Sequence, residues 1–207
     1  MIDKEKYQDK KLIAFDLYWT CITHCPNNFS LSREAVEYFK THSISLQEAK
    51  QIIENFGIKT KIFDNLIISV KHSIEGALLF PEVLETLKYI KSKWYQTAVV
   101  SNLSKDYAEP LHRLIPQRNF DYEVLSFDVW AVKPDPKIYE YLREISKINF
   151  KDIIMIWDSL KSDVMWANNV WIIPIHLNRN EEWIKEAHKK WIDFIQISTL
   201  ADLKEIL

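Results

Sequence analysis

Glycine is the residue that this chain most lacks. The 207 residues include only Gly57 and Gly76, where an average usage of about 7% predicts roughly 14 glycines. Turns and helix ends that need a left-handed backbone must therefore be built from other residues. The chain also lacks a large excess of positive or negative charge, because its formal net charge is only −2. Without a basic block there is no indication of a nucleic-acid or membrane surface, and we expect a small-molecule ligand.

Targeting and metal-binding signals are also scarce. The first ten residues are charged and polar, and no apolar run reaches the roughly 18 residues of a membrane span. We therefore expect a cytoplasmic protein without membrane contacts. Cys21 and Cys25 flank His24, but three clustered ligands lack the second half of a zinc pattern, so two free thiols are the preferred interpretation over a soft-metal site. The sequence indicates no oligomeric state.

Tryptophan, by contrast, is abundant, with eight residues. Trp94, Trp171 and Trp191 each follow a polar helix end and precede an apolar strand, at the C′ position where glycine is preferred. A left-handed non-glycine residue costs about 1–2 kcal/mol, and a large ring forced into a tight site such as that of Trp157 or Trp166 costs about 1–3 kcal/mol. Five such sites rival the stability of a whole domain, about 5–15 kcal/mol. Our hypothesis is that most or all eight are glycine in the cell, UGA codons having been translated with the wrong genetic code. The alternative is a tryptophan-rich core.

Short apolar runs alternate with amphipathic stretches of helical length. Buried strands are predicted at 12–17, 96–101, 122–125, 152–157, 171–176 and 193–197, and helices at 81–93, 136–145 and 160–169. This alternation predicts an α/β fold with a doubly wound parallel sheet that helices cover on both faces.

Between residues 22 and 79 the strand rhythm stops. Helical patterns cover 32–40 and 46–56, and Ser32 with Glu34 and Ser45 with Glu48 offer helix-start chemistry. We expect a small helical cap, residues 22–79, inserted after the first strand of a core formed by residues 1–21 and 80–207. The basic residues of this insert do not single out a substrate ligand: Arg33, Lys40, Lys59, Lys61 and Lys71.

Polar residues gather where the predicted strands end, which is where doubly wound sheets bind ligands. Asp16 follows the first strand, Ser101 ends the second, Lys133 lies in the loop after the third, and Asp158 follows the fourth, with Asp163 five residues on. Each has an ordinary structural explanation, such as a helix cap, a dipole partner, a turn residue or a surface lysine. Their order along the chain is more specific than any one of them.

With glycine restored, these segments read FDLYGT, VVSN, GAVKPDPKIY and IGDSLKSDVMGA. They resemble the four signature motifs of the haloacid dehalogenase superfamily of hydrolases, which implies a Rossmann-like core. The resemblance runs from about residue 11 to residue 178, and the helical insert lies where that family places its cap. It also implies glycine at six of the tryptophans: Trp19, Trp94, Trp130, Trp157, Trp166 and Trp171.

The resemblance implies nucleophilic attack by Asp16 on the substrate and a covalent aspartyl intermediate that water hydrolyses. Lys133 would supply one positive charge beside it, and Ser101 would hydrogen-bond a phosphoryl oxygen. Thr20 and Asn102, next to these motif residues, are predicted to bind substrate.

A metal ion is the second implication of the resemblance. Mg²⁺ would be held by Asp16, the backbone carbonyl of Tyr18 and Asp158, with Asp163 supporting the metal shell.

Tyr18 is the departure from the phosphatase pattern. Phosphatases of this superfamily usually carry a second aspartate there, which protonates the leaving oxygen, and a tyrosine with an ordinary pKa near 10 is a poor substitute. The Asp-Leu-Tyr string and Tyr139 are similar to the 2-haloacid dehalogenases, whose halide leaves without a proton, whereas Asp158 favours the metal-dependent branch. We prefer a Mg²⁺-dependent phosphatase of small phosphorylated metabolites. The alternatives are a dehalogenase-like hydrolase and a binding protein that has lost catalysis.

Overall fold

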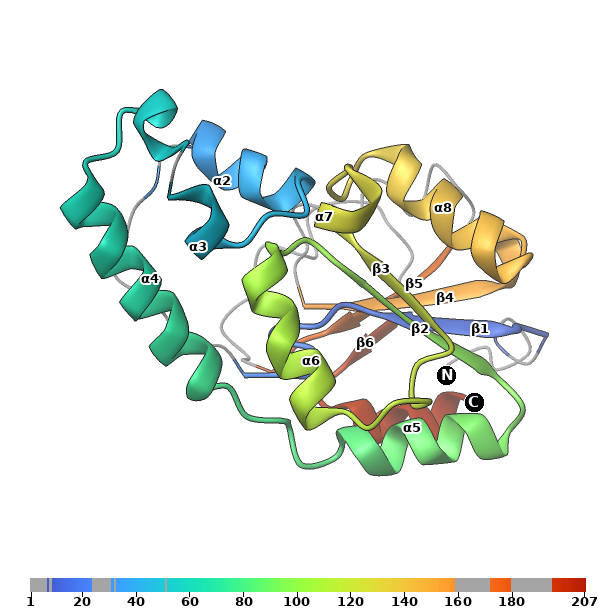
Figure 1. The fold of residues 1–207 in the computed structure, drawn as a ribbon. Coiled ribbons are helices and arrows are strands. Elements are labelled where there is room, and N and C mark those ends of the chain that lie inside the picture. Colours follow the sequence, from blue (N-terminus) through green and yellow to red (C-terminus); the bar gives the residue numbers. More distant parts are fainter. Residues whose placement is uncertain are drawn as a thin grey trace.

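The computed structural model describes residues 7, 9–23, 31, 33–50, 52–158, 172–179 and 195–207. At its centre lies a six-stranded sheet with the strand order β3-β2-β1-β4-β5-β6 (Figure 1). All five neighbouring pairs run parallel. This doubly wound order confirms the predicted α/β fold. The strands are β1 (Leu12–Phe15), β2 (Gln96–Ser101), β3 (Tyr122–Leu125), β4 (Ile153–Trp157), β5 (Ile173–Leu177) and β6 (Ile195–Ile197).

The strands form because both faces of the sheet are buried. In β1, Ile13 and Phe15 pack into one apolar cluster while Leu12 and Ala14 pack into another. Alternate side chains thus meet helices on opposite faces, which explains the continuous apolar runs of the sequence. The strand ends at Phe15 rather than at the predicted residue 17, because the carbonyl of Leu17 already closes a turn by accepting the N–H groups of residues 21 and 22.

Helices cover each face. The face of Ile13 packs on α5 (Val83–Ser92), α6 (Glu109–Leu114) and α11 (Leu203–Ile206), and the face of Leu12 packs on α8 (Pro136–Ser146), with α7 (Ser126–Val129) beside it. Short 3-10 turns complete the core: η2 (Lys105–Ala108), η3 (Phe150–Asp152) and η5 (Leu200–Asp202). The helix predicted at 160–169 lies outside the described residues.

The segment between β1 and α5 contains α2 (Arg33–Thr41), α3 (Leu46–Ala49), η1 (Ile53–Phe56) and α4 (Thr60–Glu75), seen at the left of Figure 1. These helices share an apolar cluster of their own around Phe39, Phe63 and Leu66. The capping box of Ser45 and Glu48 is present. The single helix predicted over 46–56 is wrong, because a tight bond from the Ile52 N–H to the Ala49 carbonyl at 2.8 Å bends the chain there. Both Ala49 and Ile53 remain fully buried on either side of this bend.

The insert joins the core through two adjacent stretches of chain. The N–H of Thr23 donates to the carbonyl of Leu78 at 2.7 Å, and the N–H of Leu78 donates to Thr23 Oγ1 at 2.9 Å. One step nearer the core, Ile22 and Leu79 form an antiparallel bridge. We call this paired connection, residues 22–23 and 78–79, the stem.

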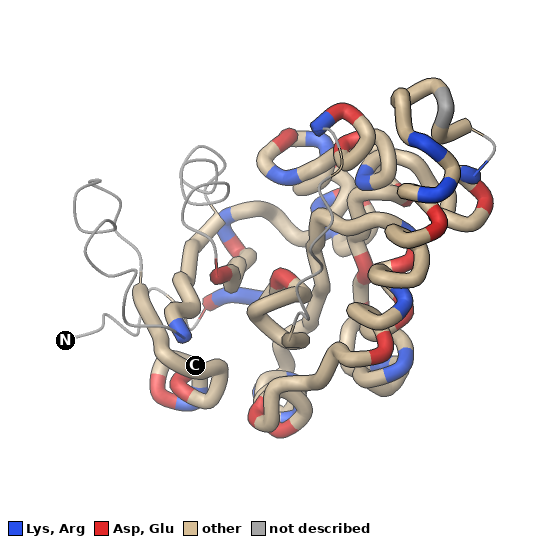
Figure 2. The backbone as a smooth tube through the Cα atoms, turned by 90° about the vertical axis from the view of Figure 1, so that its left-hand side faces the viewer, with Lys and Arg blue, Asp and Glu red and all other residues tan. Residues whose placement is uncertain are grey.

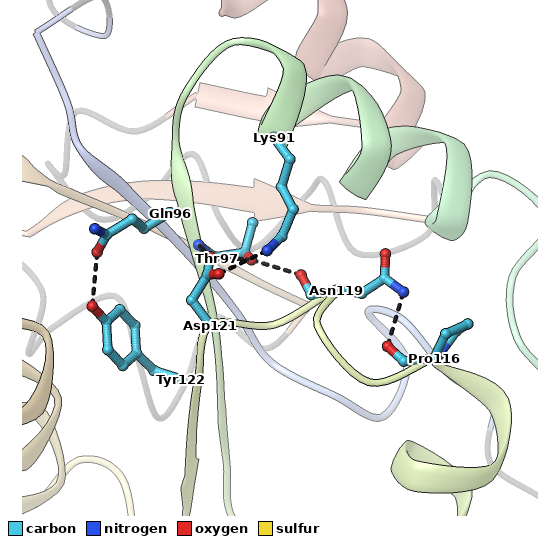
Figure 3. A network of polar contacts seen from close by, with 7 residues as sticks. All are labelled: Lys91, Gln96, Thr97, Pro116, Asn119, Asp121 and Tyr122. Carbon is cyan, nitrogen blue, oxygen red and sulfur yellow. Dashed lines mark hydrogen bonds and ion pairs between the residues drawn. The ribbon is translucent and has the colours of Figure 1, made fainter.

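A polar network ties the edge strand β3 to β2 at their amino ends, away from the predicted site (Figure 3). Asp121 accepts the N–H of Thr97 at 2.8 Å and pairs with Lys91 of α5 at 2.7 Å. The Thr97 hydroxyl donates to the carbonyl of Asn119 at 2.6 Å. These contacts fix the register of the edge strand at its amino end. They do not involve its carboxyl end, which lies on the side of the predicted site.

Tryptophan occupies left-handed backbone in three places. Trp19 has φ 63°, Trp94 has φ 67° and Trp130 has φ 57°. Trp94 follows Lys93, the C-cap residue of α5, so its predicted left-handed conformation at C′ is confirmed. Trp171 and Trp191, predicted in the same context, lie outside the described residues.

Charges of both signs are interspersed along the described chain, as Figure 2 shows. None of the helices in the described ranges has the length and apolar character that a membrane crossing requires.

Candidate active site

Asp16 is the first residue beyond β1, at the carboxyl edge of the sheet. Its N–H donates to the carbonyl of Ile156 at 2.9 Å, which extends the pairing with β4 by one step. Its Oδ1 accepts the N–H of Leu17 and the hydroxyl of Ser101, both at 2.7 Å. Its Oδ2 forms an ion pair with Lys133 Nζ at 2.8 Å. The structure thus brings together the three residues that the sequence predicts to be catalytic.

This ion pair lies largely out of water. The Lys133 side chain is 1% exposed and that of Asp16 is 16% exposed. An ionised group in such a place is stable only while its partner is present, because removing either charge leaves the other buried and uncompensated. The Asp16 carboxylate therefore remains partly accessible to solvent, while the buried Lys133 balances its charge.

Asn102 positions the lysine. Its Nδ2 donates to the carbonyl of Lys133 at 2.8 Å, and the Lys133 N–H donates to Asn102 Oδ1 at 2.6 Å. Two bonds to one side-chain amide hold the backbone that carries the Lys133 amine. The predicted role of Asn102 was substrate binding, and no local signal indicated this contact because the partners are 31 positions apart.

Asp158 is the first residue after β4. The register pairs Phe15 with Ile156, so Asp16 and Asp158 follow neighbouring strands, which lie about 4.8 Å apart in a sheet. The carbonyl of Asp158 accepts the Nε2–H of His176 in β5 at 3.1 Å. Asp163, the other predicted metal residue, lies outside the described residues.

The donor set at this edge fits a hard cation. The carboxylates of Asp16 and Asp158 and the backbone carbonyl of Tyr18 are all oxygen ligands, which Mg²⁺ prefers. Within the described ranges, no three His, Cys, Asp or Glu side chains gather as a ready metal cluster. Cys21 is buried with a free thiol, and His24 and Cys25 lie outside the described residues.

The hydroxyl of Tyr18 is engaged elsewhere. It donates to the carbonyl of Tyr107 at 3.0 Å, and the two rings meet edge to face with centroids 5.7 Å apart. Burial raises the pKa of Tyr18 far above its usual value. The hydroxyl therefore has neither the direction nor the acidity of a general acid.

Thr20 and the loop around it are held from the end of β5. Arg179 donates to the carbonyl of Thr20 at 2.8 Å, pairs with Glu82 at 2.7 Å and stacks over the ring of Phe80 at 3.6 Å. The side chain of Thr20 is fully buried, and its role in substrate binding stays a prediction. Sequence reasoning missed Arg179, although its place two residues after a strand was a usable signal.

A pocket of about 320 Å³ lies between the cap helices and the ends of β1 and β2. Most of its wall is apolar, including Phe39, Leu66 and Val70 from the cap and Leu103 and Tyr107 from the core. This volume and character are typical of small-molecule sites.

Lys40, in the last turn of α2, also lines this pocket and brings a charge from the cap. Burial lowers the pKa of Lys40, and the charge of Asp16 opposes this effect while that of Lys133 adds to it. Lys40 therefore lies within the electrostatic influence of Asp16 and Lys133. Its position on an amphipathic helix did not reveal this, because docking of the cap decides which lysine faces the core.

The geometry agrees with comparisons to known proteins. A family model for haloacid dehalogenase-like hydrolases matches residues 15–173. The chain belongs to this family. A glyceraldehyde 3-phosphate phosphatase of Methanothermobacter thermautotrophicus is 29% identical over 157 residues, 73% of this chain and 70% of that protein. A phosphoglycolate phosphatase of Vibrio parahaemolyticus is 23% identical over 187 residues, 78% of this chain and 81% of that protein.

Solved structures share the fold of this haloacid dehalogenase-like hydrolase. A 2-haloacid dehalogenase from Pseudomonas syringae superposes with a TM-score of 0.70 at 18% identity, over 95% of this chain and 97% of that one. A family enzyme from Bacteroides thetaiotaomicron, in complex with magnesium and inorganic phosphate, superposes with a TM-score of 0.59 at 18% identity, over 86% of this chain and 99% of that one.

Proposed function

We propose that the protein is a Mg²⁺-dependent phosphatase of small phosphorylated metabolites that works through an aspartyl-phosphate intermediate on Asp16. The observation that carries the proposal is the contact set of Asp16, with Lys133 Nζ at 2.8 Å and Ser101 Oγ at 2.7 Å at the carboxyl edge of the sheet. The phosphatase relatives support the choice of phosphate esters as substrates.

Each residue has a role in this reaction. A carboxylate oxygen of Asp16 attacks phosphorus, the bond to the leaving oxygen breaks, and water then hydrolyses the acyl phosphate. The positive charge of Lys133 offsets the repulsion between the Asp16 carboxylate and the approaching phosphate group. Ser101, which now donates to Asp16, is the donor for a phosphoryl oxygen. Asn102 keeps the amine of Lys133 in place.

Asp16, Asp158 and the carbonyl of Tyr18 would hold Mg²⁺, with Asp163 in support. Bound there, the ion would neutralise phosphoryl charge and favour attack by a carboxylate. The structure related to this chain that contains magnesium and phosphate supports this assignment.

The test is phosphate release from a panel of phosphorylated metabolites and aryl phosphates, with Mg²⁺ and with a chelator. We expect activity that chelation removes and that Asp16→Asn abolishes. Asp64→Asn, which removes a carboxylate from a surface ion pair with Lys50, is the matched control and should keep its activity. Full activity in Asp16→Asn would refute the proposed nucleophile.

Tyr18 favours a second candidate, a 2-haloacid dehalogenase-like hydrolase, because a halide leaves without a proton and the Tyr18 hydroxyl is bound to a carbonyl. Release of chloride from 2-chloropropionate without added metal would establish this activity. The absence of both halide and phosphate release across the panel would leave the third candidate, a binding protein with the family fold.

We also infer that the tryptophans of this chain are glycine in the living cell. The left-handed backbone of Trp19, Trp94 and Trp130 supports this, since glycine adopts it without strain. Trp157 adds a second kind of support, because its indole N–H is buried without a hydrogen-bond partner within the described ranges. Mass spectrometry of peptides from the native source decides the matter. Tryptophan found at position 157 would overturn the inference.

A further inference from the structure

The pocket that Tyr18 and Asn102 line lacks, in the part of the chain that the structure describes, an acid of the kind that a phosphatase uses. Of the described residues that line it, none is an aspartate, a glutamate or a histidine. The hydroxyl of Tyr18, two residues beyond the nucleophile, donates to the Tyr107 carbonyl. Among the described residues of the pocket wall, a leaving oxygen therefore meets no carboxylic acid or imidazole that could protonate it.

The pocket is also shaped for an apolar group. Phe39, Leu66 and Val70 of the cap face Leu103 and Tyr107 of the core across a volume of about 320 Å³. Lys40, Asn102 and Ser104 add polar groups to the lining, but a sugar or a polyol would still place hydroxyl groups against the apolar walls, where they lack hydrogen-bond partners, which is unfavourable. An aromatic ring buries apolar surface and packs against other rings instead. Trp19 also lines the pocket, and glycine at that position would widen it without changing the character of the remaining walls.

Lys40 is the cation of this pocket. It comes from the cap and lines the pocket together with Tyr18 and Asn102 of the core, and the charges of Asp16 and Lys133 act on it. A cation placed there stabilises negative charge that develops on the leaving oxygen as the bond to phosphorus breaks.

We propose that the substrates are phosphate monoesters of aromatic alcohols, and that the leaving oxygen departs as an anion paired with Lys40 rather than as a protonated alcohol. The proposal rests on the phosphatase function proposed above. Asp16 forms a bond to phosphorus, the phosphorus–oxygen bond of the ester breaks, and the electron pair stays on the aryl oxygen. The aryloxide takes its proton from water after release, so no acid in the site is needed.

The experiment compares three substrates of similar size: para-nitrophenyl, phenyl and benzyl phosphate. Phenyl and benzyl phosphate both carry a ring, but benzyl alcohol is a far weaker acid than phenol. Because a positioned general acid contributes about 10²–10⁴ in rate, we expect kcat/KM for benzyl phosphate to lie at least about 10²-fold below that for phenyl phosphate. The enzyme should carry at each tryptophan position the residue that mass spectrometry finds.

Variants at Lys40 test its part directly. Lys40→Met removes the charge and keeps an apolar stem, so it should slow phenyl phosphate more than para-nitrophenyl phosphate, whose leaving group stabilises its own charge. Lys40→Arg should recover most of the loss. Lys61→Met, on exposed surface of the cap helix α4, is the matched control and should match the unmodified enzyme with both substrates.

Tyr18→Asp supplies the missing acid and should narrow the ratio of phenyl to benzyl phosphate turnover. Benzyl phosphate hydrolysed within tenfold of phenyl phosphate by the unmodified enzyme would overturn the inference while leaving the phosphatase intact. An equal loss on both aryl esters in Lys40→Met would also overturn it. No phosphate release from any ester, or from acetyl phosphate, would instead refute the phosphatase function itself.

Discussion

Replacing Trp94 with glycine should stabilise the protein, although it removes the largest side chain in the amino-acid alphabet. Trp94 is 93% exposed and has φ 67°, so it contributes almost no packing and holds a strained backbone. The strain is about 1–2 kcal/mol. Glycine offsets about 0.4–1 kcal/mol of this gain, because it adds freedom to the unfolded chain. The net gain is therefore roughly 0.5–1 kcal/mol.

For a chain of this length each kcal/mol shifts the Tm by about 2–4 °C, so Trp94→Gly should raise it by about 1–4 °C. Lys147, which is exposed and has φ 60°, provides a positive control, and Lys147→Gly should gain a similar amount. Lys88, exposed in the middle of α5, provides the opposite control, since glycine in a helix interior costs about 1 kcal/mol. A Tm for Trp94→Gly that falls as it does for Lys88→Gly would refute the reasoning, because backbone handedness would then not decide the sign.

Three further predictions concern the site and the cap. Lys133→Met leaves the Asp16 carboxylate buried without its partner, so urea denaturation should show a free energy of unfolding lower by about 3–5 kcal/mol. A decrease in this free energy no larger than the experimental error would contradict the claim that the two charges are buried as a pair. Asn102→Ala removes both bonds to the Lys133 backbone, so steady-state kinetics should show a larger change in kcat than in KM, and a change in KM alone would assign Asn102 to substrate binding instead. Hydrogen bonds from Ser45 lower the pKa of Glu48 from 4.5 to about 2, so its stabilising effect is complete above pH 4.5 and is lost as the pH falls through about 2. The difference in urea midpoint between the unmodified protein and Glu48→Gln should accordingly shrink between pH 6 and pH 2, whereas a constant difference would contradict the shift.

Much of the core was predictable because its physical cause is local. Residues such as Leu12 and Ile13 alternate between two buried faces, and this produces an apolar run that shows in the sequence. Strand ends then placed Asp16, Ser101 and Asp158 at one edge, since parallel strands end on the same side. The left-handed conformation at Trp94 was predictable for the same reason, because a helix end followed directly by a strand requires a tight reversal.

The remaining features depend on contacts between distant segments. The bond from Tyr18 to Tyr107 spans 89 positions, and its existence depends on how the loop after β1 meets η2. The amide of Asn102 binds Lys133 because two loops approach each other, and Lys40 reaches the pocket because the cap docks with one face of α2 toward the core. The break after Ala49 likewise coincides with the bond from the Ile52 N–H to the Ala49 carbonyl, and no glycine or proline stands there to indicate it. Local periodicity carries no information about such encounters.

The stem brings both ends of the inserted cap segment to one place on the core. Because Thr23 and Leu78 are hydrogen-bonded neighbours, excising everything between them would leave two chain ends already close enough for a short hairpin turn. Asp16 and Lys133 lie outside this excision, on the sheet side of the stem. Replacing one contiguous stretch of the gene would therefore exchange Lys40 and the apolar cap wall of the pocket together, while Asp16 and Lys133 stay in the retained sheet.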